Sequence, residues 1–274
     1  MTLEDHVGDV LAKARGGWGV STEEAARLAG LSLEGYAGLE RTGECSRPPD
    51  WVALAVRLGL DAAKLERVAH GWLPASRDLT RWRELRQITT SEGMAVNCYL
   101  VWDEATREAA LFDTGWDARP VFDLIAGHGL GLQHLFITHG HPDHVAALEE
   151  IRRRCPKVQL HSGSAHAPVD QRNRPNDFIR LGSLRITNRS TPGHAEDGTT
   201  YAIGNWPEDA PHVAIVGDAL FAGSMGRASG AAFEAARRAI CEQIFSLPTE
   251  TLISPGHGPV TTVGEEQANN PFFP

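Results

Sequence analysis

The chain has 274 residues, of which 42% are hydrophobic, and a formal net charge of −9. This length and apolar content allow a large buried core, so we expect one large globular domain, with or without a smaller attachment. The negative charge argues against broad attraction to nucleic acid or to an anionic membrane, and no apolar run approaches the roughly 20 residues of a membrane span.

The first residues lack the basic-then-apolar order of a signal peptide, which favours a cytoplasmic protein that does not associate with membranes. The four cysteines lie far apart and include no Cys-x-x-Cys pair. This spacing favours neither a disulfide framework nor a thiolate zinc site.

From Met1 to about Gly71 the pattern is helical, rich in Ala, Leu, Glu and Arg. Ser21 or Thr22 can cap one helix, and Gly30 permits a tight turn before the next, which spans residues 33–41. A trailing helix is expected over residues 51–60. We predict a helical domain over residues 1–75, a linker over 76–84 and a second domain over 85–274.

The second domain mixes strand and helix patterns, which predicts an α/β fold. Alternating or continuous apolar runs bounded by Asp, Gly and Pro predict strands over residues 95–102, 109–112, 157–160 and 212–216. Apolar residues at helical spacing predict helices over residues 120–126, 145–154 and 231–245.

The most informative motif is Thr-His-Gly-His-Pro-Asp-His-Val at residues 138–145, directly after an apolar run. His139 and His141 are two apart in an extended segment, so both imidazoles can face one ion where the strand ends. Pro142 suits the first turn of a helix, which would carry Asp143 and His144 to the other side of the cluster. The motif therefore predicts a metal site, and half of a two-metal site.

Three later donors each follow a short apolar run: His194, Asp218 and His257. Ligands gather where strands end in loops at one edge of a sheet, so these side chains are expected to converge with the first cluster. Imidazole and carboxylate donors without thiolate suit zinc first, with iron or manganese as alternatives. A shared carboxylate can hold two ions about 3.5–4 Å apart with a hydroxide between them.

These motifs, in this order, resemble those of the metallo-β-lactamase superfamily over residues 85–273. The resemblance implies the αβ/βα sandwich fold. It also implies that His139, His141 and His194 hold one metal, that Asp143, His144 and His257 hold the other, and that Asp218 bridges the two. Asp113, in Asp-Thr-Gly, would contact a metal-ligating side chain rather than the metal itself. The segments at residues 217–227 and 256–272 resemble the short type of glyoxalase II-like hydrolases.

The chain departs from several relatives within that superfamily. It ends soon after His257, without the C-terminal extension that binds glutathione in glyoxalase II proper, and it has Asp218 where many exported β-lactamases have cysteine. The segment from Gly217 to Leu220 also resembles persulfide dioxygenases, which use one iron and lack the last histidine. A nuclease would require a basic cleft and a clamp domain, which this composition does not show.

The N-terminal helices resemble the Cro/C1-type helix-turn-helix family. Glu23, Leu33, Glu34 and Gly35 stand where relatives place residues that contact phosphates and bases, and they offer phosphates little. Residues 1–78 carry nine Lys or Arg against twelve Asp or Glu. Their net charge is therefore negative, whereas DNA-binding domains are usually positively charged. We therefore favour a lid, a surface for a homodimer or a wall of the substrate pocket over DNA binding.

Together these patterns predict a dinuclear metal hydrolase of small molecules, with thioesters as the first candidate substrates and lactones as the second. Asp143 and Asp218 are the expected catalytic carboxylates, with Asp143 orienting the nucleophile. A persulfide dioxygenase-like iron enzyme and a metal- or ligand-sensing DNA-binding regulator are the alternatives. Three further residues could border the pocket or orient an anionic substrate: His161, His166 and Arg227.

Overall fold

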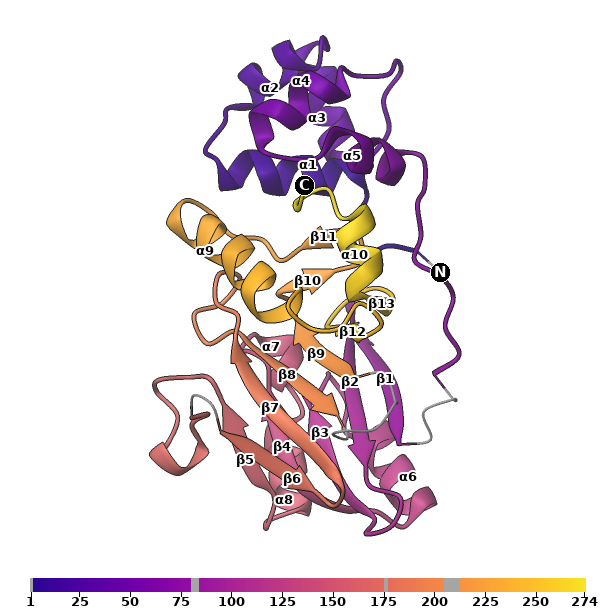
Figure 1. Cartoon of the computed structure of the whole chain (residues 1–274), viewed down its shortest axis with the longest axis vertical. Helices are drawn as coiled ribbons and strands as arrows, with labels where there is room; N and C mark the ends of the chain where they lie inside the picture. The colour runs from indigo at the N-terminus through magenta and orange to yellow at the C-terminus, as the bar shows by residue number, and fades with distance from the viewer. Residues whose placement is uncertain (1, 80–83, 175–176, 205–211) are drawn as a thin grey trace.

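The computed structural model describes residues 2–79, 84–174, 177–204 and 212–274. Part of the linker expected at residues 76–84 therefore lies outside the described residues. In the described residues before the first strand lie five α-helices: α1 (Val7–Gly17), α2 (Thr22–Leu28), α3 (Leu33–Thr42), α4 (Trp51–Leu58) and α5 (Ala62–Ala69). They form the upper part of the molecule in Figure 1.

The helix boundaries in this part follow the capping residues of the sequence. The Ser21 hydroxyl accepts a hydrogen bond from the backbone N–H of Glu24 at 3.2 Å, and the Ser32 hydroxyl accepts one from Gly35 at 3.0 Å. Gly30, at φ 67°, turns the chain between α2 and α3. The predicted positions of these helices are confirmed, whereas the family resemblance of this part stays a prediction.

From residue 84 onward the described residues form two sheets and a short hairpin. One sheet has the order β1-β2-β3-β4-β5: β1 (Leu85–Glu92), β2 (Met94–Trp102), β3 (Glu108–Phe112), β4 (Gly131–Ile137) and β5 (Gln159–Ser162). The other has the order β13-β12-β9-β8-β7-β6: β6 (Phe178–Leu181), β7 (Leu184–Ser190), β8 (Thr199–Gly204), β9 (Val213–Gly217), β12 (Leu252–Pro255) and β13 (Thr261–Thr262). The hairpin pairs β10 (Leu220–Phe221) with β11 (Ser224–Met225).

The inner faces of the two sheets pack against each other around buried aromatic rings. Phe112 stacks on Phe136 with ring centroids 4.9 Å apart, and Tyr201 of the opposite sheet lies 4.9 Å from Phe136. Helices cover the outer faces (Figure 1): α6 (Arg119–His128), α7 (Pro142–Val145), α8 (Leu148–Arg154), α9 (Ala231–Ala239), which continues as a π-helical turn (Ile240–Ile244), and α10 (Val263–Asn269). This arrangement confirms the predicted αβ/βα sandwich.

Several predicted elements differ from the structure at their ends, among them the helix expected over residues 51–60, which ends at Leu58. The helix predicted over residues 145–154 is divided into α7 and α8, because Ala147 leaves the helical conformation at φ −90° and ψ 6°. The strand predicted over residues 157–160 begins later, at Gln159. These differences concern element ends, which local patterns define poorly.

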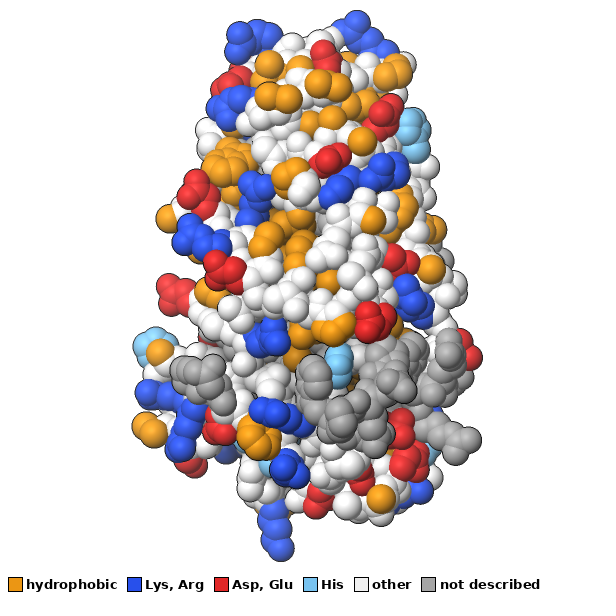
Figure 2. All heavy atoms as spheres, in the orientation of Figure 1, with side chains coloured by type: hydrophobic (Ala, Val, Ile, Leu, Met, Phe, Trp, Pro, Cys, Tyr) orange, Lys and Arg blue, Asp and Glu red, His pale blue; other side chains and the backbone are white. Residues whose placement is uncertain are grey.

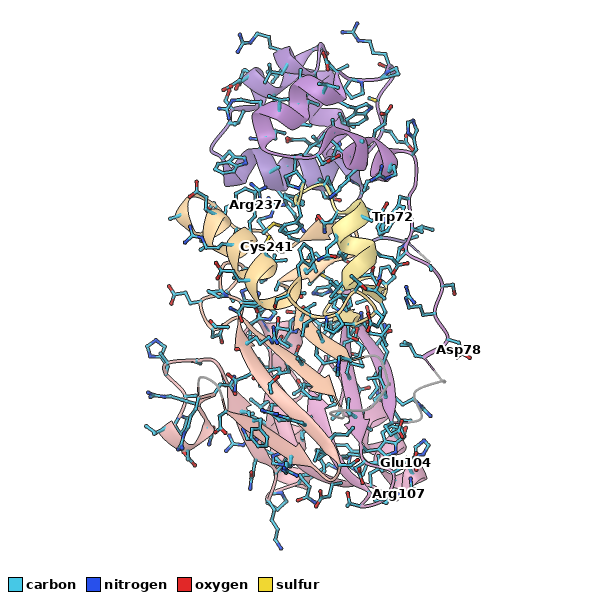
Figure 3. All side chains as sticks on the ribbon, viewed as in Figure 1. Trp72, Asp78, Glu104, Arg107, Arg237 and Cys241 are labelled. Carbon is cyan, nitrogen blue, oxygen red and sulfur yellow. The ribbon has the colours of Figure 1, made fainter. Side chains whose placement is uncertain are left out.

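The N-terminal helices and the outer face of the second sheet share one hydrophobic cluster. Val10, Leu11 and Ala14 of α1 belong to the same buried group as Phe233 of α9 and Phe272 at the C-terminus. Arg237 and Trp72, labelled in Figure 3, lie where these layers meet, and the Arg237 guanidinium donates to the carbonyls of Gly59 and Phe272. The described residues contain no helix long and apolar enough to cross a bilayer.

Glu266 of α10 is a buried carboxyl with hydrogen-bonded neighbours. It accepts from the backbone N–H of Gly223 at 2.9 Å, from Thr261 at 2.8 Å and from the Asn270 amide at 2.8 Å. Burial raises the pKa of Glu266 to about 7, despite these hydrogen bonds. The folded chain therefore binds this proton more tightly than the unfolded chain does.

Glu266→Gln is expected to flatten the dependence of stability on pH. Because the folded pKa is raised, the stabilisation from the protonated Glu266 is complete below pH 4.5 and is lost as pH rises through about 7. The loss in the native protein should be on the order of 3 kcal/mol. Denaturant titrations at several pH values measure it. Glu250→Gln, at an exposed carboxyl, should leave the profile unchanged, and a wild-type profile in Glu266→Gln would contradict this account.

Candidate metal centre

The ends of several strands position the expected donors at one edge of the sandwich. His139 follows β4, Asp218 follows β9 and His257 follows β12. His141 is the residue before α7, and Pro142 begins that short helix, as the sequence predicts. The neighbouring pairs β3–β4 and β9–β12 are parallel, so their carboxyl ends meet at this edge.

Three histidines form the first group of donors. The Nε2 atom of His139 lies 3.0 Å from Nδ1 of His141, and the Nε2 atom of His194 lies 3.0 Å from the same Nδ1. One ligand atom from each of the three lies within 4.8 Å of the others. His194 reaches the group from the loop between β7 and β8.

The second group consists of Asp143, His144 and His257, whose ligand atoms also lie within 4.8 Å of one another. The His257 Nε2 is 3.2 Å from an Asp143 oxygen, and the His144 Nε2 is 3.5 Å from that oxygen. Asp218 lies between the groups, since its oxygens are 3.3 Å from His144 Nε2, 3.5 Å from His194 Nε2 and 3.4 Å from His257 Nε2. The structure thus brings all seven predicted residues together, while their role as ligands stays a prediction.

The buried donors of this cluster suit metal ions. His144 is fully buried and Asp218 is 8% exposed. His144 Nε2 and Asp218 Oδ1 lie 3.3 Å apart as an ion pair, but neither atom makes a hydrogen bond within the described residues. A buried polar atom without a hydrogen bond costs about 1–3 kcal/mol. A divalent ion between imidazole and carboxylate donors removes that cost, and the set contains no thiolate. The residues present therefore fit two divalent cations.

The electrostatics at His144 and His257 of the second donor group favour positive charge. Burial alone would lower the pKa of His144, but the adjacent Asp113 and Asp218 raise it to about 10. Burial likewise opposes protonation of His257, but Asp218 raises its pKa to about 9. Burial would raise the pKa of Asp218, yet His144 and His257 hold it well below its ordinary value. The carboxylates therefore create a negative potential that divalent cations would neutralise.

Backbone and side-chain groups form hydrogen bonds with the Nδ1 atoms of three of the donor histidines. Nδ1 of His144 donates to Asp113 at 2.7 Å, and Nδ1 of His257 donates to the Ala95 carbonyl at 2.6 Å. Nδ1 of His194 lies 3.2 Å from the carbonyl of Arg227. Such bonds set the tautomer and leave Nε2 of each ring directed at the cluster.

Asp113 itself adopts an unusual backbone conformation, with φ 57°. Its carboxylate accepts hydrogen bonds from the Thr138 backbone at 2.8 Å and from the Thr138 hydroxyl at 2.7 Å, besides the bond from His144. A non-glycine residue at positive φ is strained, and these three bonds offset the strain. The geometry therefore supports the expected role of Asp113, which is to orient His144 by accepting its Nδ1 hydrogen bond.

Asp113→Asn is expected to weaken metal binding by about 10–100-fold, because asparagine has one acceptor oxygen where the two carboxylate oxygens accept three hydrogen bonds. Asparagine tolerates positive φ, so the backbone should remain unchanged. Competition with a chromophoric chelator measures the affinity. Asp123→Asn, an exposed residue of α6, is the matched control, and equal affinities for the two variants would contradict this role.

Two glycines allow the close approach of the donor loops. A Cβ on Gly256 would lie 2.3 Å from the Asp218 carboxylate and 2.6 Å from the His144 ring. A Cβ on Gly226 would lie 1.9 Å from the Asp218 carbonyl and 2.9 Å from His194. The Gly-His-Gly-Pro and Gly-Arg segments of the sequence therefore have a packing reason as well as a chemical one.

The remaining predicted residues lie outside the donor groups. His161 pairs instead with His134, with ring nitrogens 3.0 Å apart, a contact that sequence spacing did not indicate. His166 is exposed. Arg227 is exposed and lies beside His194 in the lining of a cavity.

Sequence reasoning also missed the proximity of the chain's first residues to the metal centre. A Cβ on Gly258 would lie 3.0 Å from the backbone nitrogen of Glu4. Lys13 of α1 donates to the Met225 carbonyl at 2.9 Å and pairs with Asp5. No local pattern in the sequence carries this long-range packing.

The family comparison agrees with this geometry. The Lactamase_B family model, described as the metallo-beta-lactamase superfamily, matches residues 92–257, which include all seven donors. The chain belongs to the metallo-β-lactamase superfamily. A "Probable metallo-hydrolase YqgX" of Bacillus subtilis is 29% identical over 64% of this chain and 90% of its own length. A "Hydroxyacylglutathione hydrolase GloC" of Haemophilus influenzae is 29% identical over 65% and 92%.

Three solved structures have a similar fold. ETHE1 from Myxococcus xanthus has a TM-score of 0.59 and 31% identity, covering 68% of this chain and 83% of that one. BLEG-1 B3 metallo-beta-lactamase has a TM-score of 0.59 and 26% identity, covering 69% and 98%. A di-iron-bound form of TTHA1623 has a TM-score of 0.51 and 28% identity, covering 69% and 100%.

Proposed function

We propose that this superfamily hydrolase holds two divalent ions and cleaves thioesters or related esters of small molecules. The observation that carries the proposal is the pair of three-residue donor groups with Asp218 between them. The relative named hydroxyacylglutathione hydrolase supports thioesters as the substrate class. Zinc is the first candidate, with iron or manganese as alternatives, and the di-iron-bound neighbour keeps iron open.

The chain's own residues would prepare this reaction in three ways. Asp218 is held ionised by His144 and His257, so its two oxygens can serve both donor groups. Asp143 is 6% exposed, and its carboxylate beside His257 can accept a proton and orient the attacking water. Ions bound here would supply a water of lowered pKa and polarise the substrate carbonyl.

An iron-dependent dioxygenase of persulfides is the second candidate, favoured by the resemblance of residues 217–220 to that group of enzymes. One observation counts against it. His257 lies with Asp143 and His144 in a complete second donor group, which a mononuclear enzyme would not need.

Turnover of a thioester panel by the metal-loaded protein tests the proposal. S-lactoylglutathione and simple acyl thioesters should be hydrolysed, and hydrolysis should stop on chelation and return with zinc, iron or manganese. No hydrolysis with any of these ions would contradict it. Oxygen uptake with a glutathione persulfide, at one iron per chain, would favour the second candidate instead.

The N-terminal helices are proposed to serve the enzyme rather than to bind DNA. On the face shown in Figure 2, their Lys and Arg side chains are interspersed with acidic and apolar ones. Such a surface gives phosphates little attraction. Tight, salt-sensitive binding to a DNA operator in a low-salt gel shift would contradict this proposal and would favour the regulator.

A further inference from the structure

A cavity of about 320 Å³ lies between the N-terminal helices and the hydrolase fold. Its size is at the lower end of the range for small-molecule sites. Its walls come from α1, from the loop that carries His194, from the segment after β11 and from α9. The lining residues are Lys13, Gly16, Gly193, His194, Arg227, Ala228, Ser229 and Ala232.

The cavity borders the candidate metal centre at His194. The same ring that lines the cavity places its Nε2 3.0 Å from His141 and 3.5 Å from Asp218. A substrate whose reacting carbonyl lies at the donor groups could therefore extend one of its ends into this cavity.

Helix α1 is held firmly in its place as a wall. Gly230, at the start of α9, donates to the Gly17 carbonyl at 3.1 Å, and the rings of Trp18 and Phe233 meet edge to face at 5.4 Å. Lys13 donates to the Met225 carbonyl at 2.9 Å. These contacts join α1 to α9 and to β11, which precedes the third wall segment.

The two adjacent glycines of α1 face different surroundings. A Cβ on Gly17 would lie 2.5 Å from the Phe233 ring, so no larger residue fits there. A Cβ on Gly16 would meet no atom within 4 Å, although Gly16 lines the cavity. Packing therefore requires glycine at position 17, whereas at position 16 the absent side chain leaves the cavity open.

The lining also limits the charge of what can enter. Its two charged side chains are Lys13, whose ammonium group is paired with Asp5, and the cation Arg227; no carboxylate is among its lining residues. Within the described residues the Arg227 guanidinium has no hydrogen bond or ion pair. A cationic group would be repelled, so the cavity suits a compact neutral or anionic group.

We propose that helix α1 forms one wall of a substrate subsite in this cavity, and that Gly16 sets the size of the group that fits. This inference rests on the proposed hydrolase function, because the kinetic test of the subsite measures thioester hydrolysis. It assigns the N-terminal helices a direct part in substrate selection.

Gly16→Leu tests this inference, with Gly38→Leu as the matched control. Gly38 lies in α3, outside the cavity lining, and a Cβ there would also meet no atom within 4 Å. The substrates are acetyl, hexanoyl and benzoyl thioesters of N-acetylcysteamine and of glutathione. The group that enters the cavity is either the acyl group or the thiol. Along whichever of these enters, Gly16→Leu should lower kcat/KM about tenfold or more for the larger groups and change it by no more than about twofold for the smallest substrate.

The metal content of both variants should equal that of the wild type, and Gly38→Leu should keep the wild-type profile. Ala232→Leu, on the opposite wall, should reproduce the selective loss and serves if Gly16→Leu does not fold. Unchanged kinetics across the panel, or an equal loss for every substrate, would overturn the inference.

A binding measurement separates this inference from the proposed function. If the wild type hydrolyses no thioester, saturation-transfer NMR with glutathione and with hexanoate still reports on the cavity. Weaker binding of either probe to Gly16→Leu, but not to Gly38→Leu, would support the subsite while the hydrolase proposal fails. Equal binding by the variants, or no binding by the wild type, would overturn the subsite.

Discussion

Asp218→Ala is expected to lower kcat/KM for thioesters by a factor on the order of 10³ or more, about 4 kcal/mol of transition-state stabilisation. Asp218 is the carboxylate that lies within 3.5 Å of donor nitrogens from both groups. Its removal also takes away a carboxylate that favours positive charge at His144 and His257. We therefore expect fewer than two tightly bound ions per chain.

Metal analysis together with steady-state kinetics measures both effects of this change. Asp123→Ala, at an exposed position on α6, should retain full metal content and activity. If Asp218→Ala kept two ions and wild-type turnover, a bridging role for this carboxylate would be untenable.

Phe233→Ala is expected to destabilise the whole chain by about 3–5 kcal/mol. Phe233 is 1% exposed and contacts the Trp18 ring at 5.4 Å and the Phe272 ring at 6.1 Å. Its ring also fills the space in front of Gly17. Since this one side chain joins α1, α9 and the C-terminus, a cavity at its position affects the N-terminal helices and the sandwich together.

Urea denaturation of the metal-loaded protein measures this loss, followed by circular dichroism and by tryptophan fluorescence. Because one hydrophobic cluster extends through both parts, the two signals should change in a single transition. Phe178→Ala, at a 39% exposed ring, should cost much less. Separate transitions for the helices and the sandwich would contradict a shared core.

The sequence allowed much of the fold and of the candidate site to be predicted. Pro142 after His141 predicts the start of α7, and Ser21 predicts the cap of α2, because both signals act over a few residues. The convergence of His194, Asp218 and His257 follows from one rule, that each residue comes after a strand that ends at the same edge.

Contacts between distant segments could not be predicted in this way. The approach of Glu4 to Gly258, the bond from His257 to the Ala95 carbonyl and the open space beside Gly16 all depend on tertiary packing. The pairing of His134 with His161 likewise arises from the parallel register of β4 and β5. No spacing in the sequence encodes such contacts.

Metal titration of the metal-free protein tests the central claim most directly. Calorimetry with zinc, checked by elemental analysis of the dialysed protein, should show two tightly bound ions per chain. His257→Ala should reduce this number to one, since it removes a donor from the second group only. A wild-type protein that binds less than one ion per chain, and is unaffected by His257→Ala, would contradict the two-metal centre.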